Sequence, residues 1–197
     1  MAPSLTLPRA RGRGRPRLAS TILATEDAFR NGDAEPLLRF ATRCATPSPM
    51  PAIRLARPKD HAAVVALVNE AYAVYVPRIG RPPAPMLEDY GSLIGGGRVH
   101  VLEDETGIAG VVVLIPEEHA MLLDNVAVKV TARRRGYGRM LIAFAEATAR
   151  AAGYRTIRLF TNERMIENIA RYPRLGYVET HRNEEEGLRR VHFAKQL

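Results

Sequence analysis

The stretch that decides the fold is residues 126–141, which read Val-Ala-Val-Lys-Val-Thr-Ala-Arg-Arg-Arg-Gly-Tyr-Gly-Arg-Met-Leu. An apolar run, Leu122 to Val128, leads into its basic turn, and an alanine-rich amphipathic stretch, Met140 to Ala152, follows the turn. This order predicts a strand, a turn and the start of a helix. The first N–H groups of a helix have no partners within it and carry partial positive charge, so such a turn favours a phosphate-bearing ligand.

The residues of the turn strengthen this expectation. Gly136 and Gly138 allow the backbone to approach a ligand closely, and Arg133 to Arg135 add full charges. A dinucleotide site is the main alternative, because the glycines could begin a G-x-G-x-x-G/A pattern. The third position of that pattern is Leu141, which is too bulky for close helix packing, and the first half of the chain lacks a strand–helix–strand order. The sequence has no Gly-Lys-Ser/Thr, which excludes a Walker phosphate loop.

The composition is that of an ordinary globular protein with one domain and an additional segment. The chain has 197 residues, of which 46% are hydrophobic and 25% are charged. Its single cysteine, Cys44, excludes an intramolecular disulfide, and no Cys/His cluster has metal-ligand spacing, so we expect no metal. No stretch approaches about 18 consecutive apolar residues. We therefore expect a soluble cytoplasmic protein without a membrane partner.

Residues 1–50 differ from the rest of the chain. Pro and Gly lie among arginines up to Arg17, and eight Arg stand against four acidic residues in this segment. This composition predicts a largely disordered basic arm, followed by one folded domain over residues 51–197. A short alternating strand pattern begins directly after Met50, so a start of translation at Met50 is an open alternative.

Two further interpretations of the arm stay open. Within residues 9–17, residues 13–17 read Arg-Gly-Arg-Pro-Arg and resemble an AT-hook, in which arginines enter a narrow minor groove. The absence of acidic residues before Glu26 also suits an organellar transit peptide, although Pro8 and Pro16 break the amphipathic helix that such a peptide requires. Outside the arm the excess of positive charge is small, so we do not expect nucleic-acid binding there.

From Ala52 onward, the sequence alternates between strand and helix patterns. Apolar residues at helical spacing follow Asp60, which we expect to cap that helix, whereas four prolines exclude a helix interior within residues 76–85. The other expected elements are strands at 52–56, 99–103, 108–115, 121–128, 156–160, 177–182 and 190–194, and helices at 86–94, 138–152 and 163–175. They predict an α/β domain with a mixed sheet.

Residues 126–141 resemble motif A of the GNAT acyltransferases, whose acyl-CoA loop reads Q/R-x-x-G-x-G/A. Arg133, Gly136 and Gly138 occupy its fixed positions. The context also agrees, because the motif follows an expected strand and opens an expected helix.

Residues 162–177 resemble the second half of the same signature, with Asn168, Tyr172 and the pair Gly176-Tyr177 at the family's spacing. The resemblance covers roughly residues 52–197. It implies a GNAT-like fold, in which helices flank a central, mostly antiparallel sheet.

The resemblance also implies acetyl-CoA as the co-substrate. The residues that it assigns to the coenzyme are Val126, Ala127, Val128, Arg133, Arg134, Arg135, Gly136, Tyr137, Gly138, Arg139 and Asn168. The turn would bind the pyrophosphate, and N–H groups of Val126 and Val128 would stabilise charge on the thioester carbonyl. Asn168 would hydrogen-bond the coenzyme arm; the alternative for Asn168 is an exposed helix residue.

Tyr172 matches the family's acid, which protonates the leaving thiolate. A phenol with an ordinary pKa near 10 keeps its proton at neutral pH and can donate it. The alternative is a core aromatic residue with a satisfied hydroxyl. Pro173 departs from the family pattern, and we expect it to kink or shorten the helix.

Asp124 is the candidate base, because an acceptor ammonium must lose a proton before it attacks. It precedes Val126 and Val128 by two and four residues, so strand alternation places all three on one face. A turn residue at the strand end and an acceptor-binding group are the alternatives for Asp124. Glu118 and His119 are weaker candidates.

Arg78 and Arg81 belong to the proline-rich loop that overhangs the acceptor in this fold. They are candidates to bind a carboxylate on the substrate. The alternative is that they only cover surface.

These residues together predict an N-acetyltransferase that transfers acetyl from acetyl-CoA to a small-molecule or peptide amine by direct attack. Cys44 lies outside the matched region and no Ser/His/Asp set replaces it, so we expect no acyl-enzyme. The alternative is a non-catalytic acyl-CoA-binding or regulatory module, tethered to DNA through the arm. The fold does not choose among acceptors, and a homodimer stays open.

Overall fold

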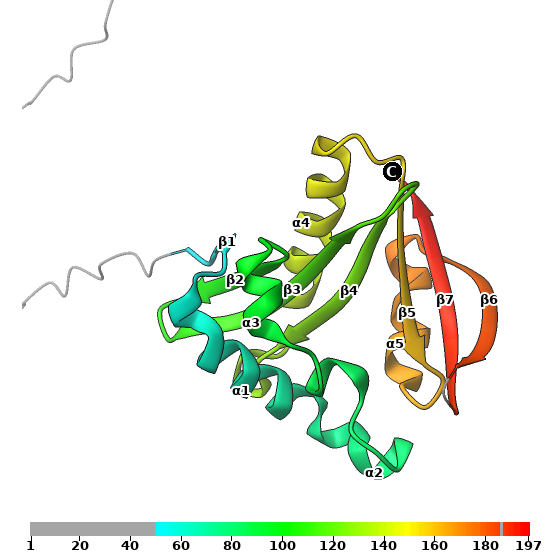
Figure 1. The fold of residues 1–197 in the computed structure, drawn as a ribbon, viewed down its shortest axis with the longest axis horizontal. Helices are drawn as coiled ribbons and strands as arrows, with labels where there is room; N and C mark the ends of the chain where they lie inside the picture. Colours follow the sequence, from blue (N-terminus) through cyan, green and yellow to red (C-terminus); the bar gives the residue numbers. More distant parts are fainter. Residues whose placement is uncertain (1–49, 186) are drawn as a thin grey trace, which may run out of the picture. The chain divides into compact units, whose positions relative to one another are not determined.

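The computed structural model describes residues 50–185 and 187–197, which belong to one compact unit (Figure 1). The predictions of a disordered arm, of an AT-hook-like segment and of a transit peptide all concern residues that lie outside the described part of the chain. The same holds for Cys44.

A seven-stranded sheet with the order β1-β2-β3-β4-β5-β7-β6 forms the centre of this unit. Neighbouring strands are antiparallel except for the parallel pair β4 and β5. The mixed, mostly antiparallel sheet predicted from the sequence is therefore confirmed. The strands are β1 Ala52–Leu55, β2 Val99–Asp104, β3 Gly107–Pro116, β4 Met121–Val128, β5 Thr156–Asn162, β6 Val178–Glu185 and β7 Leu188–Gln196.

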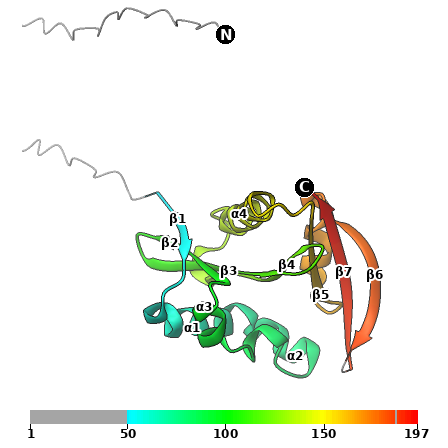
Figure 2. The same cartoon turned by 45° about the horizontal axis from the view of Figure 1, so that its top comes forward.

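Helices cover both faces of the sheet. In Figure 2, α4 lies on one face of β1 to β4, and α1 and α3 lie on the other. The α-helices are α1 His61–Tyr72, α2 Val76–Ile79, α3 Tyr90–Gly95, α4 Tyr137–Ala151 and α5 Ile166–Arg171. Short 3-10 turns are η1 Pro58–Asp60, η2 Ala73–Tyr75, η3 Ala84–Met86, η4 Val130–Ala132 and η5 Pro173–Leu175.

Two predicted helices are shorter than expected. The helix expected at 86–94 is a 3-10 turn that is followed by the six residues of α3, whose start Asp89 caps by accepting the N–H of Ser92. The helix expected at 163–175 is limited to α5 and continues as a 3-10 turn that begins at Pro173. A proline cannot donate the hydrogen bond that continues an α-helix, so the predicted shortening by Pro173 is confirmed.

The proline-rich stretch 76–85 also contains one short helix. Pro77 lies in the first turn of α2, where its missing N–H is not needed, and Gly80 ends the helix with a φ of 87°. The remaining prolines lie outside helix interiors, as predicted.

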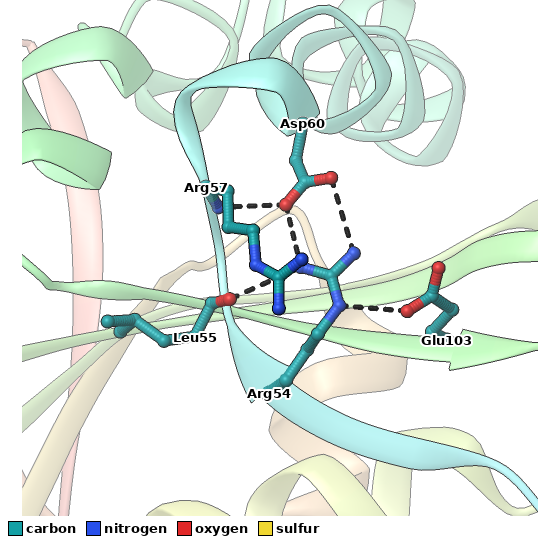
Figure 3. A network of polar contacts seen from close by, with 5 residues as sticks. All are labelled: Arg54, Leu55, Arg57, Asp60 and Glu103. Carbon is teal, nitrogen blue, oxygen red and sulfur yellow. Dashed lines mark hydrogen bonds and ion pairs between the residues drawn. The ribbon is translucent and has the colours of Figure 1, made fainter.

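Asp60 has a different role from the predicted helix cap. Its carboxylate makes no capping hydrogen bond to α1. It accepts hydrogen bonds from the Arg57 N–H at 2.8 Å and from the Arg54 guanidinium at 2.7 and 3.2 Å (Figure 3). Arg54 also donates to Glu103 on β2. The hydrogen bond from Arg54 to Asp60 holds the pKa of Asp60 below its usual range. Asp60 therefore fixes β1 to the turn before α1.

The sheet divides into two halves beside β4. β4 and β5 are paired only at Met121 with Ile157 and at Leu122 with Arg158, and beyond this point the strands diverge (Figure 1). On the other side of β4, Val113 pairs with Asn125, and Leu114 with Leu123, so Asp124 is the extra residue of a β-bulge. The second half of β4 thus has an edge without a strand partner.

Two apolar cores lie on opposite faces of the sheet. One packs α4 against alternate residues of β3, β4, β5 and β7; the other packs α1 and α3 against β2 and β3. Helix α4 packs closely on the sheet at Gly110, where an added Cβ would lie 2.9 Å from Leu141 Cδ1 and 3.3 Å from Leu102 Cβ.

The helical stretch Pro58–Ile79 is long and apolar enough, by length and composition alone, to cross a membrane. In this fold its apolar residues Val64, Leu67, Val68 and Ala71 are buried in the core against the sheet. Within the described residues, no group of three or more His, Cys, Asp or Glu is arranged to hold a metal ion.

We expect Gly110→Ala to lower the free energy of unfolding by about 1–3 kcal/mol, because the new methyl group overpacks a buried contact. Denaturant unfolding of this variant and of the wild type measures the change. Gly95→Ala is the matched control, since an added Cβ at Gly95 has no atom within 4 Å. Equal stability of Gly110→Ala and Gly95→Ala would contradict the close packing of α4.

Candidate active site

A large cleft lies over the turn between β4 and α4. Its volume is about 720 Å³, within the usual range for a ligand site. One wall consists of the second half of β4 and the basic turn, and the other comes from α5 and η5. Of the predicted coenzyme residues, those that line the cleft are Val126, Ala127, Val128, Arg133, Arg134, Gly136, Tyr137, Gly138, Arg139 and Asn168.

The backbone of the basic turn is held in an uncommon conformation. Gly136 has a φ of 84°, and Arg134 has a φ of 67°, a left-handed value that is unfavourable for a residue with a side chain. Helix α4 begins at Tyr137, so its first N–H groups are directed into the turn. A turn with left-handed residues that leads directly into a helix start forms a concave group of N–H donors, which suits an anion.

Side chains of the turn anchor it to two other elements. Arg133 donates to the carbonyl of Ala71 on α1 at 3.3 Å. The buried hydroxyl of Tyr137 donates to Asp104 at the end of β2 at 3.1 Å. These contacts attach the start of α4 to α1 and to the β2–β3 hairpin.

Arg135 is the predicted coenzyme residue that the structure does not bring to the cleft. Its guanidinium lies 3.6 Å from Asp104 and 3.4 Å from Glu105, on the β2–β3 hairpin. Its place between two acidic residues explains why its side chain is directed away. The Arg135 side chain therefore does not line the cleft in this structure, and its assignment to the coenzyme stays a prediction.

The second wall of the cleft carries cations that sequence reasoning missed. Arg171 ends α5, and Arg174 lies in η5, and both line the cleft opposite the basic turn. Arg78 also lines this wall, where it is paired with Glu167 at 2.7 Å. Arg171 follows the signature residue Asn168 by three positions, and Arg174 follows Tyr172 by two, and this closeness was the one signal available in the sequence.

A smaller pocket lies next to the cleft, on the side of β5 and β7. Its volume is about 70 Å³. Its walls come from the loop after α2, from the bulge of β4, and from β5, α5 and β7, and the residues that line it are Tyr72, Ile79, Pro83, Ala84, Pro85, Leu123, Asp124, Val126, Phe160, Thr161, Asn162, Met165, Asn168, Tyr172, Leu188 and Arg190.

The predicted acceptor residues Arg78 and Arg81 do not line this pocket. Arg78 lies in the large cleft instead, and Arg81 lines neither cavity. From the proline-rich stretch 76–85, the residues that line the small pocket are Ile79, Pro83, Ala84 and Pro85. The assignment of these two arginines to the acceptor stays a prediction, and the side chains that line the small pocket are other residues.

The two cavities meet at four shared residues. Tyr72, Val126, Asn168 and Tyr172 line both of them. A ligand that extends along the cleft and a second ligand in the small pocket would therefore come together beside these side chains.

Tyr172 is held at this junction by aromatic contacts. Its ring lies edge-on to Tyr177, with centroids 5.9 Å apart, and 5.4 Å from the ring of Phe193. Burial raises the pKa of Tyr172 to about 12, so its hydroxyl keeps its proton throughout the neutral range. The ring is thus packed as in a core while the residue lines both cavities.

Asp124 lies in the small pocket at the bulge of β4. The bulge interrupts the strict alternation that we assumed, yet Asp124 and Val126 still line the same pocket. Burial, together with the nearby negative charge of Glu88, raises the pKa of Asp124 to about 6. Glu118 and His119, the weaker candidates, are exposed and line neither cavity.

The side-chain amide of Asn168 makes only long contacts within the protein. Its amide nitrogen lies 3.5 Å from Thr161 Oγ1 and 3.7 Å from Met165 Sδ. The amide therefore lies at the junction without a strong internal hydrogen bond, as a ligand-binding group requires.

Tyr72 lines both cavities and is a site residue that the sequence pattern did not single out. Its hydroxyl donates to Asn125 Oδ1 at 2.7 Å, and Asn125 Nδ2 donates to Tyr90 Oη at 2.8 Å. Tyr90 in turn donates to the carbonyl of Pro85 at 2.8 Å. This chain of hydrogen bonds connects the junction to the loop over the small pocket.

Comparisons with known proteins agree with this geometry. Residues 95–179 match the family described as acetyltransferase (GNAT) domain. A search of curated proteins found no match.

Solved structures share the fold at low sequence identity. The ribosomal-protein-S18-alanine N-acetyltransferase of Escherichia coli superposes with a TM-score of 0.62 at 20% identity, over 75% of this chain and 94% of that chain. The PaiA N-acetyltransferase of Thermoplasma acidophilum, in complex with coenzyme A, superposes with a TM-score of 0.62 at 13% identity. The match covers 75% of this chain and 99% of that chain. YncA of Salmonella typhimurium, with its cofactor acetyl-CoA, superposes with a TM-score of 0.58 at 18% identity. The match covers 75% of this chain and 94% of that chain.

The matched residues 95–179 contain the basic turn, most of the cleft and the shared tyrosine Tyr172. Residues 95–179 therefore carry an acetyltransferase (GNAT) domain.

Proposed function

We propose that the chain is an N-acetyltransferase that binds acetyl-CoA in the large cleft and an amine in the small pocket. The acetyl group would pass directly from donor to acceptor in a ternary complex. The observation that carries this proposal is that the two cavities meet at the shared residues Tyr72, Val126, Asn168 and Tyr172.

The donor site has the charge and the donors that coenzyme A requires. The pyrophosphate would accept hydrogen bonds from N–H groups at the start of α4 and contact Arg133, Arg134 and Arg139. Arg171 and Arg174 on the opposite wall add positive charge for the remaining phosphate. Structural neighbours that contain coenzyme A or acetyl-CoA support this assignment.

The thioester carbonyl would lie beside the free edge of β4. Pairing between β4 and β5 stops at Leu122. Beyond this point, not every backbone N–H of β4 has a strand partner, and Val126 and Val128 lie in this part of the strand. A backbone N–H at this edge would donate to the carbonyl oxygen as it gains negative charge.

The transfer requires two proton movements. The amine nitrogen attacks the carbonyl carbon, and the carbon–sulfur bond breaks as the thiolate leaves. Tyr172 would donate a proton to the sulfur, and Asp124 would accept a proton from the attacking amine, directly or through water. Asp124 and Tyr172 both line the small pocket, so one pocket contains both candidate groups.

We expect Gly138→Ala to weaken acetyl-CoA binding by roughly 10-fold or more, because a methyl group in the turn keeps the pyrophosphate away from the backbone. The fold should tolerate this change, since the new Cβ would lie 3.9 Å from Val128 Cγ2, an ordinary contact. Calorimetry of the full chain with acetyl-CoA measures the affinity, with Gly95→Ala as the matched control. Failure of the wild type to bind acetyl-CoA would overturn the proposed function.

Tyr172→Phe should lower kcat by about 10²–10⁴-fold with little change in acetyl-CoA affinity, because it removes the proton donor alone. Thiol release in the presence of an accepted amine measures the rate. Tyr72→Phe should cost much less, since the Tyr72 hydroxyl donates its proton to Asn125. The reverse order of losses would assign the acid to Tyr72, and full activity of Tyr172→Phe would remove Tyr172 from this role.

We expect kcat/KM to rise with pH through about 6, because Asp124 must be ionised to accept a proton. Asp124→Asn should lose this rise. The raised pKa means that the folded state holds the proton more tightly than the unfolded state, so ionised Asp124 lowers stability above pH 6.

Asp124→Asn should therefore raise Tm at pH 8 relative to the wild type and have less effect near pH 4, where the carboxyl is protonated in the folded protein. Rates between pH 5 and 7 and melting curves at both pH values test this. An unchanged pH profile in the variant would show that another group titrates.

A further inference from the structure

We propose that the acceptor is a compact amino acid, whose carboxylate binds Arg190 while its amine lies at Asp124. This inference rests on the proposed function and names the acceptor class for the small pocket. It replaces Arg78 and Arg81 as the candidate carboxylate-binding residues.

Arg190 is positioned by strand pairing and by an aromatic contact. It pairs with Asn162 across β5 and β7, and both residues line the small pocket. Its guanidinium carbon lies 4.7 Å from the centroid of the Phe160 ring, which also lines the pocket. The side chain is only 20% exposed. A stacked and largely buried guanidinium presents its donors in a fixed orientation, which suits a carboxylate.

The ion pair that Arg190 makes in this structure leaves the guanidinium able to bind a ligand. Its partner, Glu185, lies at the tip of the β6–β7 hairpin, and 53% of its side chain is exposed. Solvent around the exposed Glu185 carboxylate weakens this ion pair. The hydrogen bond to Glu185 uses Nη1 of Arg190, while the fork of an arginine carries five N–H donors.

Opposite charges lie on different walls of the pocket. Asp124 is on β4, and Arg190 is on β7, and Arg190 is the nearby cation that lowers the pKa of Asp124 against the effect of burial. Glu88 adds negative charge on the side of Asp124. A ligand with an ammonium group and a carboxylate matches this polarity, whereas a simple alkylamine would leave Arg190 without a partner on the ligand.

The size of the pocket favours a compact acceptor. The volume is about 70 Å³, and the loop wall contains Pro83 and Pro85, whose fixed backbone angles restrict adaptation to a larger ligand. The pocket therefore suits an amino acid with a short side chain better than a bulky polyamine or a long peptide.

Matched pairs of acceptors test the inference. Glycine, alanine and serine are compared with glycinamide, alaninamide and serinamide, with acetyl-CoA as donor and thiol release as the readout. We expect the wild type to have the higher kcat/KM for each free acid. Arg190→Gln should lower the ratio of acid to amide by roughly 10- to 100-fold, the usual effect of losing hydrogen bonds to a charged group.

Two further variants separate binding from folding. Arg189→Gln is the matched control, because Arg189 is the neighbouring arginine of β7, pairs with Glu163 and Glu184 and does not line the small pocket. It should keep the wild-type ratio of acid to amide. Arg190→Lys should keep part of the preference for acids, since it retains the charge but loses the fork.

The outcomes distinguish this inference from the proposed function. Equal rates for acids and amides, turnover restricted to peptides, or an Arg190→Gln ratio like that of the wild type would overturn the amino-acid acceptor and leave the acetyltransferase standing. Calorimetry with acetyl-CoA on the same preparations tests the donor site separately. Absence of acetyl-CoA binding would overturn both.

Discussion

The separation of β4 from β5 is the constraint on which the site depends. After Leu122 the strands are no longer paired, and the bulge at Asp124 bends β4 at the same place. One edge of β4 is thereby left for a ligand, and α5 and β7 can form the opposite wall. A continuous ladder would have closed both cavities with backbone hydrogen bonds. The helices on the two faces of β1 to β4 keep β4 fixed while its edge stays open (Figure 2).

The charges of the two cavities follow this division. Arginines from the turn and from α5 line the large cleft, which suits the polyanionic donor that we propose. The small pocket instead holds one buried carboxylate, Asp124, and one arginine, Arg190, on separate walls. A buried ionised carboxylate lowers stability, and the raised pKa of Asp124 is the sign of that cost. This unfavourable charge lies on the residue that we propose as the base.

Local patterns in the sequence were sufficient for the strands, for α4 and for the basic turn, because glycine spacing and apolar periodicity act over a few residues. They could not show that Arg135 pairs with acids on another hairpin, or that Arg171 faces the turn across the cleft. Tyr72 was hidden in a similar way, since a tyrosine on the apolar face of a helix fits a core equally well. These errors all concern contacts between segments far apart in the chain.

The left-handed backbone at Arg134 affects the free energy of folding and the free energy of ligand binding in different ways. This conformation costs about 1–2 kcal/mol in a residue with a side chain, and it is already present without ligand. The cost therefore falls on folding, and in the proposed donor site a phosphate would meet a preorganised turn that loses little conformational entropy. A glycine at this position would remove the strain but make the unliganded turn more mobile. Stability and donor affinity are thus opposed at a single residue.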